Sequence, residues 1–158
     1  MKNDTITING LRFKNKVMIS PMCQYSSNNG CPSDWHYHHL RNLIETGAGS
    51  LVIESTAVSA KGRITKKDLC LFNKSHLREH KKLVKYLKTI KRIPIILQIS
   101  HSGRKGSAEI PFKKKNKPLT KKFGWRTFAP SSIQRDKNWP KPTAMSKKQI
   151  KVLIQKFQ

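Results

Sequence analysis

Hydrophobic and polar positions alternate at the start of the chain and then give way to short apolar runs. Over residues 5–17 the alternation surrounds the pair Asn9-Gly10, and this combination predicts an antiparallel hairpin with a tight turn. The run Val17-Met18-Ile19 follows directly and is closed by Ser20-Pro21. Such a run indicates a short buried strand that ends in a loop.

Segments with helical spacing then alternate with further apolar runs. We expect a helix from about residue 35 to 46, capped by Asp34, and a second helix that begins at Ser75. The apolar runs at 50–54 and 95–99 predict two more strands. Residues 146–149 have the form of a capping box, which predicts the start of a third helix.

The stretch between the last strand and the last helix is different in character. Residues 105–144 are basic, carry four prolines after Phe112 and lack periodicity, so we expect a long loop within one domain, residues 1–158. The order strand, helix, strand, helix, strand, loop, helix predicts an α/β fold. Its parallel sheet has about three strands joined by right-handed crossover helices.

Each of the three predicted parallel strands ends in a segment that carries polar or reactive side chains. These segments are residues 20–23, 54–56 and 98–101. Parallel strands bring their carboxyl ends to one edge of a sheet, where ligands of such folds gather. Gln98 is the most telling of these residues, because an amide inside an apolar strand needs partners. It could bind the edge of a ring that bears an imide, or satisfy a neighbouring backbone group.

The cysteines allow two interpretations. Cys23 lies just past a strand end, so it is either a thiol that faces a cofactor or substrate, or a small buried apolar residue. Spacing alone favours the second interpretation, because no histidine or aspartate partner can be assigned. Cys31 and Cys70 belong to no motif, and we interpret them as structural or incidental.

Two further groups of residues suggest ligands without defining a site. His36 and His39 share a helix face, but the sequence around them has no HExxH or CxxC pattern, so packing or hydrogen bonding at a helix start is favoured over a metal site. Arg104 follows Gly103 in a loop, where pairing with a phosphate or carboxylate and simple solvation are equally favoured.

Charge and composition add a competing hypothesis. The chain of 158 residues has 33 Lys+Arg against 8 Asp+Glu, a formal net charge of +25. An excess of this size is typical of nucleic-acid binding, but the lysines are spread along the chain, with local density at 81–82, 113–117 and 121–122. This distribution favours solvated surface lysines over a dedicated polyanion site.

Composition also bears on location. The longest apolar stretch, near residues 93–99, is broken by Pro94 and Gln98, so no membrane span is expected. The first residues lack an apolar leader segment, and three cysteines suit a reducing compartment. We therefore expect a cytoplasmic protein.

A series of short motifs covers nearly the whole chain. They are LRFKNKV at 11–17, SPMCQY at 20–25, DWH at 34–36, GAG at 47–49, VIESTAV at 52–58, GRIT at 62–65, Gln98, HSGRK at 101–105, GW at 124–125 and APS at 129–131. In composition and order these motifs resemble the Old Yellow Enzyme family, in particular its NADPH dehydrogenase branch with a cysteine in the first strand loop.

The resemblance implies a (β/α)8 TIM barrel that holds FMN at its carboxyl face. In this family NAD(P)H delivers hydride to FMN, and the reduced flavin passes hydride to the β-carbon of an activated alkene. By position, the resemblance implies that Tyr25 faces the substrate and that Gln98 binds the pyrimidine edge of the flavin. The implied ring-lining residues are Ser20, Pro21, Met22, Cys23 and Ser55, with the Cys23 thiol near the reactive end. At Ser55 family members often carry alanine.

The length of the chain bears on whether it can form a complete barrel. A barrel of this type needs about 250 residues. We therefore expect the chain to be the N-terminal portion of the barrel, a truncated product or one half completed by a second chain. The family's carbonyl-polarising histidine pair or His/Asn pair and its phosphate-binding loops belong to the later strands. The alternative is an inactive remnant or a basic protein that binds polyanions.

Overall fold

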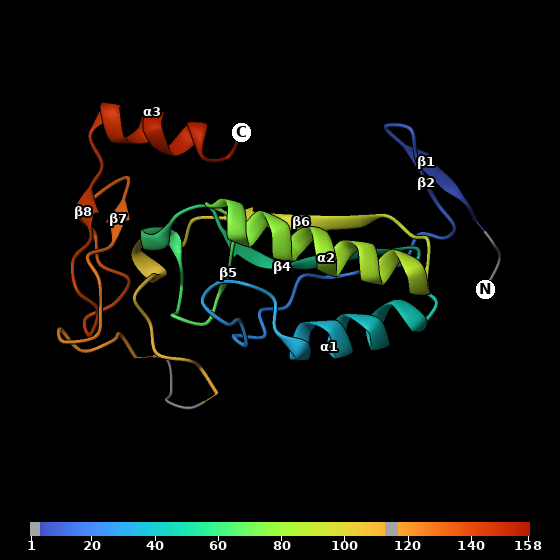
Figure 1. Cartoon of the computed structure of the whole chain (residues 1–158). Helices are drawn as coiled ribbons and strands as arrows, with labels where there is room; N and C mark the ends of the chain where they lie inside the picture. The colour runs from blue at the N-terminus through green and yellow to red at the C-terminus, as the bar shows by residue number, and fades with distance from the viewer. Residues whose placement is uncertain (1–3, 113–116) are drawn as a thin grey trace.

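The protein has an α/β fold in which helices cover a parallel sheet (Figure 1). The computed structural model describes residues 4–112 and 117–158. The lysine-rich positions 113–116, and residues 1–3 at the start of the chain, lie outside the described residues.

The amino-terminal hairpin forms as predicted. Strands β1 (Ile6–Ile8) and β2 (Leu11–Phe13) pair antiparallel, with Ile6 opposite Phe13. The two turn residues have positive φ angles, 47° at Asn9 and 77° at Gly10. Tight hairpin turns require this left-handed conformation, which asparagine and glycine adopt most readily. The hairpin prediction is therefore confirmed.

The central sheet is parallel, and β4 (Ser50–Ala57) lies in its middle. It pairs with β3 (Met18–Ile19) and with β6 (Ile95–Ser100), and its last residues pair with the short β5 (Leu69–Cys70). The three predicted parallel strands are confirmed. The structure adds β5 and extends β4 beyond residue 54.

The first parallel strand is less buried than its apolar run suggested. Val17 and Met18 are 49% and 50% exposed, and Ile19 is half-buried. The prediction of a buried strand is therefore wrong at these positions. The physical reason is that β3 lies at an edge of the described sheet, with β4 as its strand neighbour.

The helices occur where expected, but two of them begin at different caps. Helix α1 (Asp34–Glu45) is capped by Ser33, one residue before the predicted Asp34. Helix α2 (Lys74–Ile90) is capped by Asn73, whose side chain accepts from His76 N, rather than beginning at Ser75. Helix α3 (Lys147–Gln155) has the predicted capping box at Ser146. No helix in the described part of the chain is long and apolar enough to cross a membrane.

Short elements punctuate the loops. The 3-10 turn η1 (Ala60–Gly62) follows β4, and η2 (Gly103–Lys105) follows β6. Within the stretch 105–144 the strands β7 (Phe128–Ala129) and β8 (Thr143–Ala144) pair in parallel. This stretch therefore has a small sheet of its own that leads into α3.

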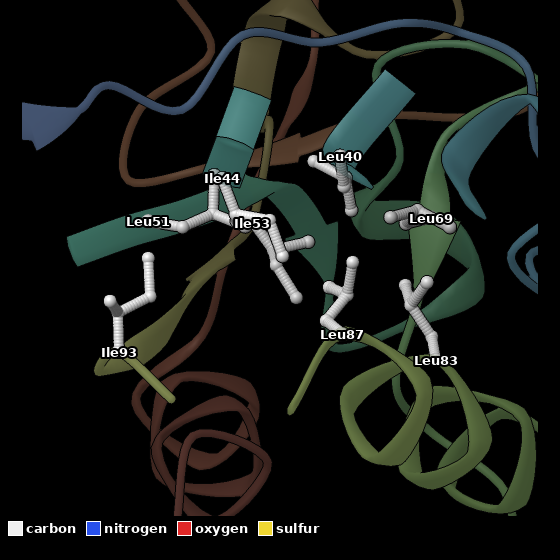
Figure 2. Packing of buried hydrophobic residues seen from close by; sticks show 8 residues of the cluster. All are labelled: Leu40, Ile44, Leu51, Ile53, Leu69, Leu83, Leu87 and Ile93. Atoms are coloured by element: carbon white, nitrogen blue, oxygen red, sulfur yellow. The ribbon is translucent and has the colours of Figure 1, made fainter. Parts of the chain in front are cut away.

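One apolar core joins the helices to the sheet (Figure 2). It contains residues of α1, α2, β4 and β5 together with a residue of the turn before β6: Leu40, Ile44, Leu51, Ile53, Leu69, Leu83, Leu87 and Ile93. Tyr37 of α1 and Tyr86 of α2 also meet, with ring centroids 5.2 Å apart. The core fixes β4 against both helices and thereby fixes where the strand ends lie.

Candidate functional site

Residues 20–23, 54–56 and 98–101, at the carboxyl ends of β3, β4 and β6, meet at one edge of the sheet. The hydroxyls of Ser55 and Ser100 lie 2.5 Å apart and join the ends of β4 and β6. The segment after β3 reaches the same edge, because the Ser55 backbone lies close enough to Cys23 to lower the pKa of its thiol. The common edge expected from parallel strands is therefore present.

Cys23 is half-buried rather than fully covered. Burial raises the pKa of the Cys23 thiol, and the carboxylates of Glu54 and Asp68 raise it further. The side chain of Tyr25 also acts on the Cys23 thiol and lowers its pKa, but the pKa stays raised overall. The group is accordingly a protonated thiol near neutral pH.

Tyr25 adopts an unusual backbone conformation beside this thiol. Its φ angle is 49°, in the left-handed region that bulky residues rarely occupy. The ring is half-buried and makes an edge contact with Phe112 at a centroid distance of 5.9 Å. Burial raises the pKa of the Tyr25 hydroxyl to about 12, so the group can donate a proton in a hydrogen bond but stays neutral.

The other predicted site residues differ in exposure. Ser20 and Met22 are exposed and Pro21 is half-buried, so this part of the segment presents atoms to the outside. Gln98 is exposed near the end of β6, and its amide makes no hydrogen bond with the described residues. The expectation that this amide satisfies a neighbouring backbone group is therefore not met.

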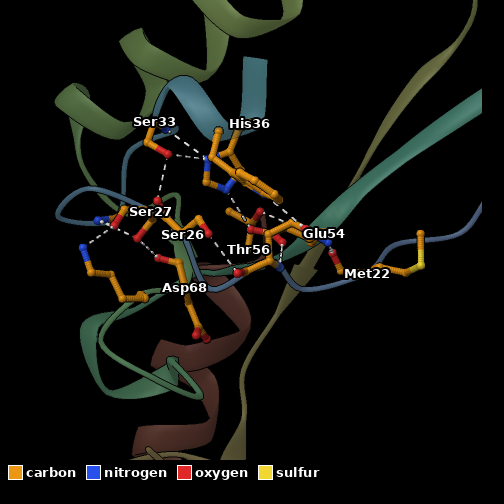
Figure 3. A network of polar contacts seen from close by, with 12 residues as sticks. Met22, Ser26, Ser27, Ser33, His36, Glu54, Thr56 and Asp68 are labelled. Carbon is orange, nitrogen blue, oxygen red and sulfur yellow. Dashed lines mark hydrogen bonds and ion pairs between the residues drawn. The ribbon is translucent and has the colours of Figure 1, made fainter. Parts of the chain in front are cut away.

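A buried polar network lies beneath the segment that carries Cys23 and Tyr25 (Figure 3). Glu54 and His36 are 5% and 1% exposed, and His36 Nε2 lies 3.1 Å from Glu54 Oε1. The other carboxylate oxygen, Oε2, accepts a hydrogen bond from the backbone N–H of Gln24. The network thus joins α1 and β4 to the segment between Cys23 and Tyr25.

Sequence reasoning missed the pairing of His36 with Glu54. The two histidines weighed as a pair separate in the structure, since His39 stacks on Trp35 at 5.9 Å while His36 points to Glu54. A usable signal was present, because an acidic residue within the apolar strand 50–54 needs a buried partner. Within residues 4–112 and 117–158, no group of three or more metal-ligating side chains lies together.

A second buried carboxylate orders the turn after η1. Asp68 Oδ1 accepts from Thr65 N at 2.9 Å and from the Thr65 hydroxyl at 2.8 Å, and Oδ2 accepts from Ile64 N at 2.5 Å. Burial nevertheless raises the pKa of Asp68. The backbone of Asp68 accepts a hydrogen bond from the Ser27 hydroxyl, which ties this turn to the segment after β3.

The remaining candidate residues are Cys31, Cys70 and Arg104. Cys31 is half-buried, and Cys70 is buried in β5, where burial raises its pKa to about 12. Arg104 lies in η2 and lines a cavity of about 100 Å³ together with Trp125 and Lys141. The pairing of Arg104 with a phosphate or carboxylate stays a prediction.

The chain is similar to known proteins in both sequence and fold. The family model described as NADH:flavin oxidoreductase / NADH oxidase family matches residues 4–158. An NADH:flavin oxidoreductase of Gibberella zeae is 35% identical over 156 residues, which cover 96% of this chain and 38% of that protein. An NADPH dehydrogenase of Bacillus subtilis is 31% identical over 154 residues, covering 96% and 41%.

Solved structures agree on the fold. Morphinone reductase superimposes with a TM-score of 0.80 at 15% identity, covering 98% of this chain and 42% of that chain. The old yellow enzyme homologue from Zymomonas mobilis gives a TM-score of 0.77 at 16% identity, covering 98% and 42%. The chain thus spans about two fifths of the length of the relatives it matches, and its fold corresponds to the N-terminal portion of their TIM barrels.

Proposed function

This chain belongs to the NADH:flavin oxidoreductase / NADH oxidase family, and on that premise we propose that it forms the N-terminal part of an FMN-dependent NAD(P)H oxidoreductase barrel. FMN, when bound, supplies hydride transfer from NAD(P)H to an activated alkene or another electron acceptor. The part of the protein in hand contributes the edge of the sheet at which Cys23, Ser55 and Gln98 lie.

The observation that carries the proposal is the unpaired amide of Gln98. An exposed side chain with a donor and an acceptor at the end of a strand fits the imide edge of an isoalloxazine ring, which offers the complementary acceptor and donor. Elsewhere on the edge, Ser20, Pro21, Met22 and Ser55 would line the ring. The donor set is neutral, which suits an uncharged aromatic system.

Cys23 and Tyr25 would act beside the ring rather than on its edge. A protonated thiol beside the Ser55 backbone and the Tyr25 hydroxyl would offer the ring a polarisable neighbour. The neutral Tyr25 hydroxyl can donate a hydrogen bond to an acceptor substrate on the outer side. In this arrangement the chain binds, orients and donates hydrogen bonds, while the hydride chemistry belongs to the cofactor.

Flavin binding by Gln98→Ala tests the assignment. Loss of the amide removes hydrogen bonds worth roughly 1–1.5 kcal/mol net, so FMN affinity should fall by about tenfold. Flavin fluorescence titration of the 158-residue chain measures it. Gln155→Ala, an exposed glutamine at the end of α3, is the matched control and should bind FMN like the unsubstituted chain.

Two outcomes count against the proposal. One is an unsubstituted chain that leaves flavin fluorescence unchanged up to the highest soluble FMN concentration. The other is a Gln98→Ala chain that binds FMN as tightly as the Gln155→Ala control, which would place the ring elsewhere.

A complete barrel would need strands beyond those that the described residues form. In the described sheet β6 pairs with β4 along one edge and has no strand on the other. We propose that a further parallel strand pairs with this open edge, supplied by the remainder of the protein or by a second chain. That added part would bring the phosphate-binding loops and the carbonyl-polarising pair that the resemblance implies.

A second candidate function, polyanion binding, is favoured by one surface of α2. Basic side chains follow one another along this helix around the exposed Leu77 and line a shallow groove: Lys74, Arg78, Lys81, Lys82 and Lys85. A row of this kind can bind phosphates without reading sequence. A colourless protein that ignores FMN and loses DNA affinity steeply with added salt would support this reading, and a protein that binds neither would support an inactive remnant.

Charge reversal on α2 separates the two functions. Lys81→Glu with Lys85→Glu should abolish salt-sensitive DNA binding if the α2 row carries it, and should leave FMN affinity unchanged. The matched control is Lys147→Glu with Lys151→Glu on α3. Equal losses in both double variants would indicate a general effect of net charge.

A further inference from the structure

The segment that carries Cys23 and Tyr25 is fixed to the rest of the molecule through one buried carboxylate. Glu54 accepts from the Gln24 backbone N–H with Oε2 and from His36 Nε2 with Oε1 (Figure 3). Gln24 lies between the two candidate site residues. A carboxylate at this point therefore holds the backbone from which both side chains project.

The hydrogen bonds assign the proton of His36. Ser33 N donates to His36 Nδ1 at 3.0 Å, so Nδ1 is an acceptor and carries no proton. The ring proton then sits on Nε2 and points to Glu54 Oε1, 3.1 Å away. Since Ser33 caps α1, the start of this helix orients the ring, and the ring orients the carboxylate.

Further contacts hold the same segment in its unusual shape. Gln24 Nε2 donates to Met22 O at 2.8 Å, and the Ser26 hydroxyl donates to Gln24 O at 3.0 Å. Tyr25 has a φ angle of 49° within this span. A residue in that region persists when its surroundings impose the conformation, and such positions are concentrated at functional sites.

We propose that Glu54, oriented by His36, is a positioning residue that holds the Cys23 thiol and the Tyr25 hydroxyl at the edge of the sheet. The inference rests on the proposed function, because a flavin at that edge is what gives the placement of these two groups a chemical consequence. Neither Glu54 nor His36 touches the candidate ring-lining residues Met22 and Gln98 through a side-chain hydrogen bond in the described part of the chain.

The substitution Glu54→Gln distinguishes a positioning role of Glu54 from a role in which its side chain merely fills space, because glutamine has nearly the same size. The Gln24 N–H and His36 Nε2 bind different carboxylate oxygens, and glutamine has an NH2 donor in place of one of them, so one of the two donors would face another donor. The substitution also removes a negative charge near Cys23. The charged and titratable groups that act on the thiol are Glu54, Asp68 and Tyr25, and the two carboxylates raise the thiol pKa.

The test is Glu54→Gln in the full chain without flavin, with two measurements. Peptide-resolved alkylation by iodoacetamide across pH should show the Cys23 midpoint at lower pH than in the unsubstituted chain, with Cys31 and Cys70 unchanged. Hydrogen exchange of the Gln24 amide should accelerate by about tenfold or more, as loss of a charge-assisted hydrogen bond implies. Glu45→Gln, at the exposed end of α1, is the matched control and should change neither readout.

Three results would overturn the inference. The Cys23 midpoint could stay where it is, the Gln24 amide could remain as protected as before, or all three cysteines could react faster together, which would indicate general loosening. If Glu54→Gln fails to fold, nuclear magnetic resonance of the unsubstituted chain decides: a ring proton on Nε2 of His36 supports the inference and one on Nδ1 contradicts it. FMN titration of the unsubstituted chain reports separately on the proposed function.

Discussion

Individual residues of this protein owe their chemistry to burial more than to close opposite charges. Burial is the first cause of the raised pKa at Cys23, Tyr25 and Asp68, and of the lowered pKa at His80. In each case burial disfavours the charged form. The edge of the sheet is consequently a site of neutral donors, which is suited to an uncharged ring and unsuited to acid or base catalysis by ionised groups.

His80 should make the stability of the fold depend on pH. Burial lowers its pKa to about 4, its Nε2 contacts Cys70 O at 3.2 Å, and its Nδ1 is buried without a partner in the described structure. In the unfolded chain His80 binds its proton near pH 6.5, whereas in the folded protein it does so only near pH 4. The contribution of His80 to the free energy of unfolding should therefore be largest above pH 6.5 and should fall as the pH drops toward 4. The loss amounts to about 3 kcal/mol.

Urea unfolding at several pH values measures this effect. Asp68 opposes it in part, because a raised carboxyl pKa favours the folded state as that group protonates. His80→Leu should flatten the pH dependence between 6.5 and 4, whereas His38→Leu, at an exposed position of α1, should leave it as it is. A His80→Leu chain with an unchanged slope would show that another group titrates.

Helices, strands and turns are predictable from the sequence where their formation depends on neighbouring residues. The Asn9-Gly10 hairpin and the Ser146 capping box depend on neighbouring residues, and both form as predicted. The caps of α1 and α2 shifted by one or two residues, because Ser33 and Asn73 are as competent to cap as the residues beside them.

Features that depend on distant partners could not be read from the sequence. Strand β5 has two residues and exists because Leu69 and Cys70 pair with the end of β4. Glu54 and His36 are 18 positions apart, so their contact depends on how α1 packs on the sheet. Gln98 stands out in the sequence as a polar residue in an apolar strand, whereas its exposure on the sheet depends on the fold.

Helix α2 packs on the core through one face, and alanine substitutions on the two faces of the helix should therefore differ in their effect on stability. Leu83 is fully buried in the core whereas Leu77 is 45% exposed on the same helix. Leu83→Ala should lower the free energy of unfolding by about 2–5 kcal/mol because it leaves a cavity. Leu77→Ala should cost less than about 1 kcal/mol in the same denaturation experiment. Similar losses at the two positions would mean that α2 does not pack as described.

At the scale of the whole molecule, the described chain leaves surfaces that a barrel would cover. The outer edge of β6 has no strand neighbour in the described sheet, and Ile150 and Ile154 of α3 are 40% and 54% exposed. Open edges and exposed apolar side chains favour association. The net charge of +25 opposes it, since strong like charge keeps copies apart.

We propose that the carboxyl ends of β3, β4 and β6 form a flavin-binding edge. The most direct measurement is the change in backbone amide resonances of the 158-residue chain on titration with FMN. The largest changes should fall on Met22, Cys23, Ser55 and Gln98. Changes confined to the lysines of α2, or the absence of any change at saturating FMN, would contradict it.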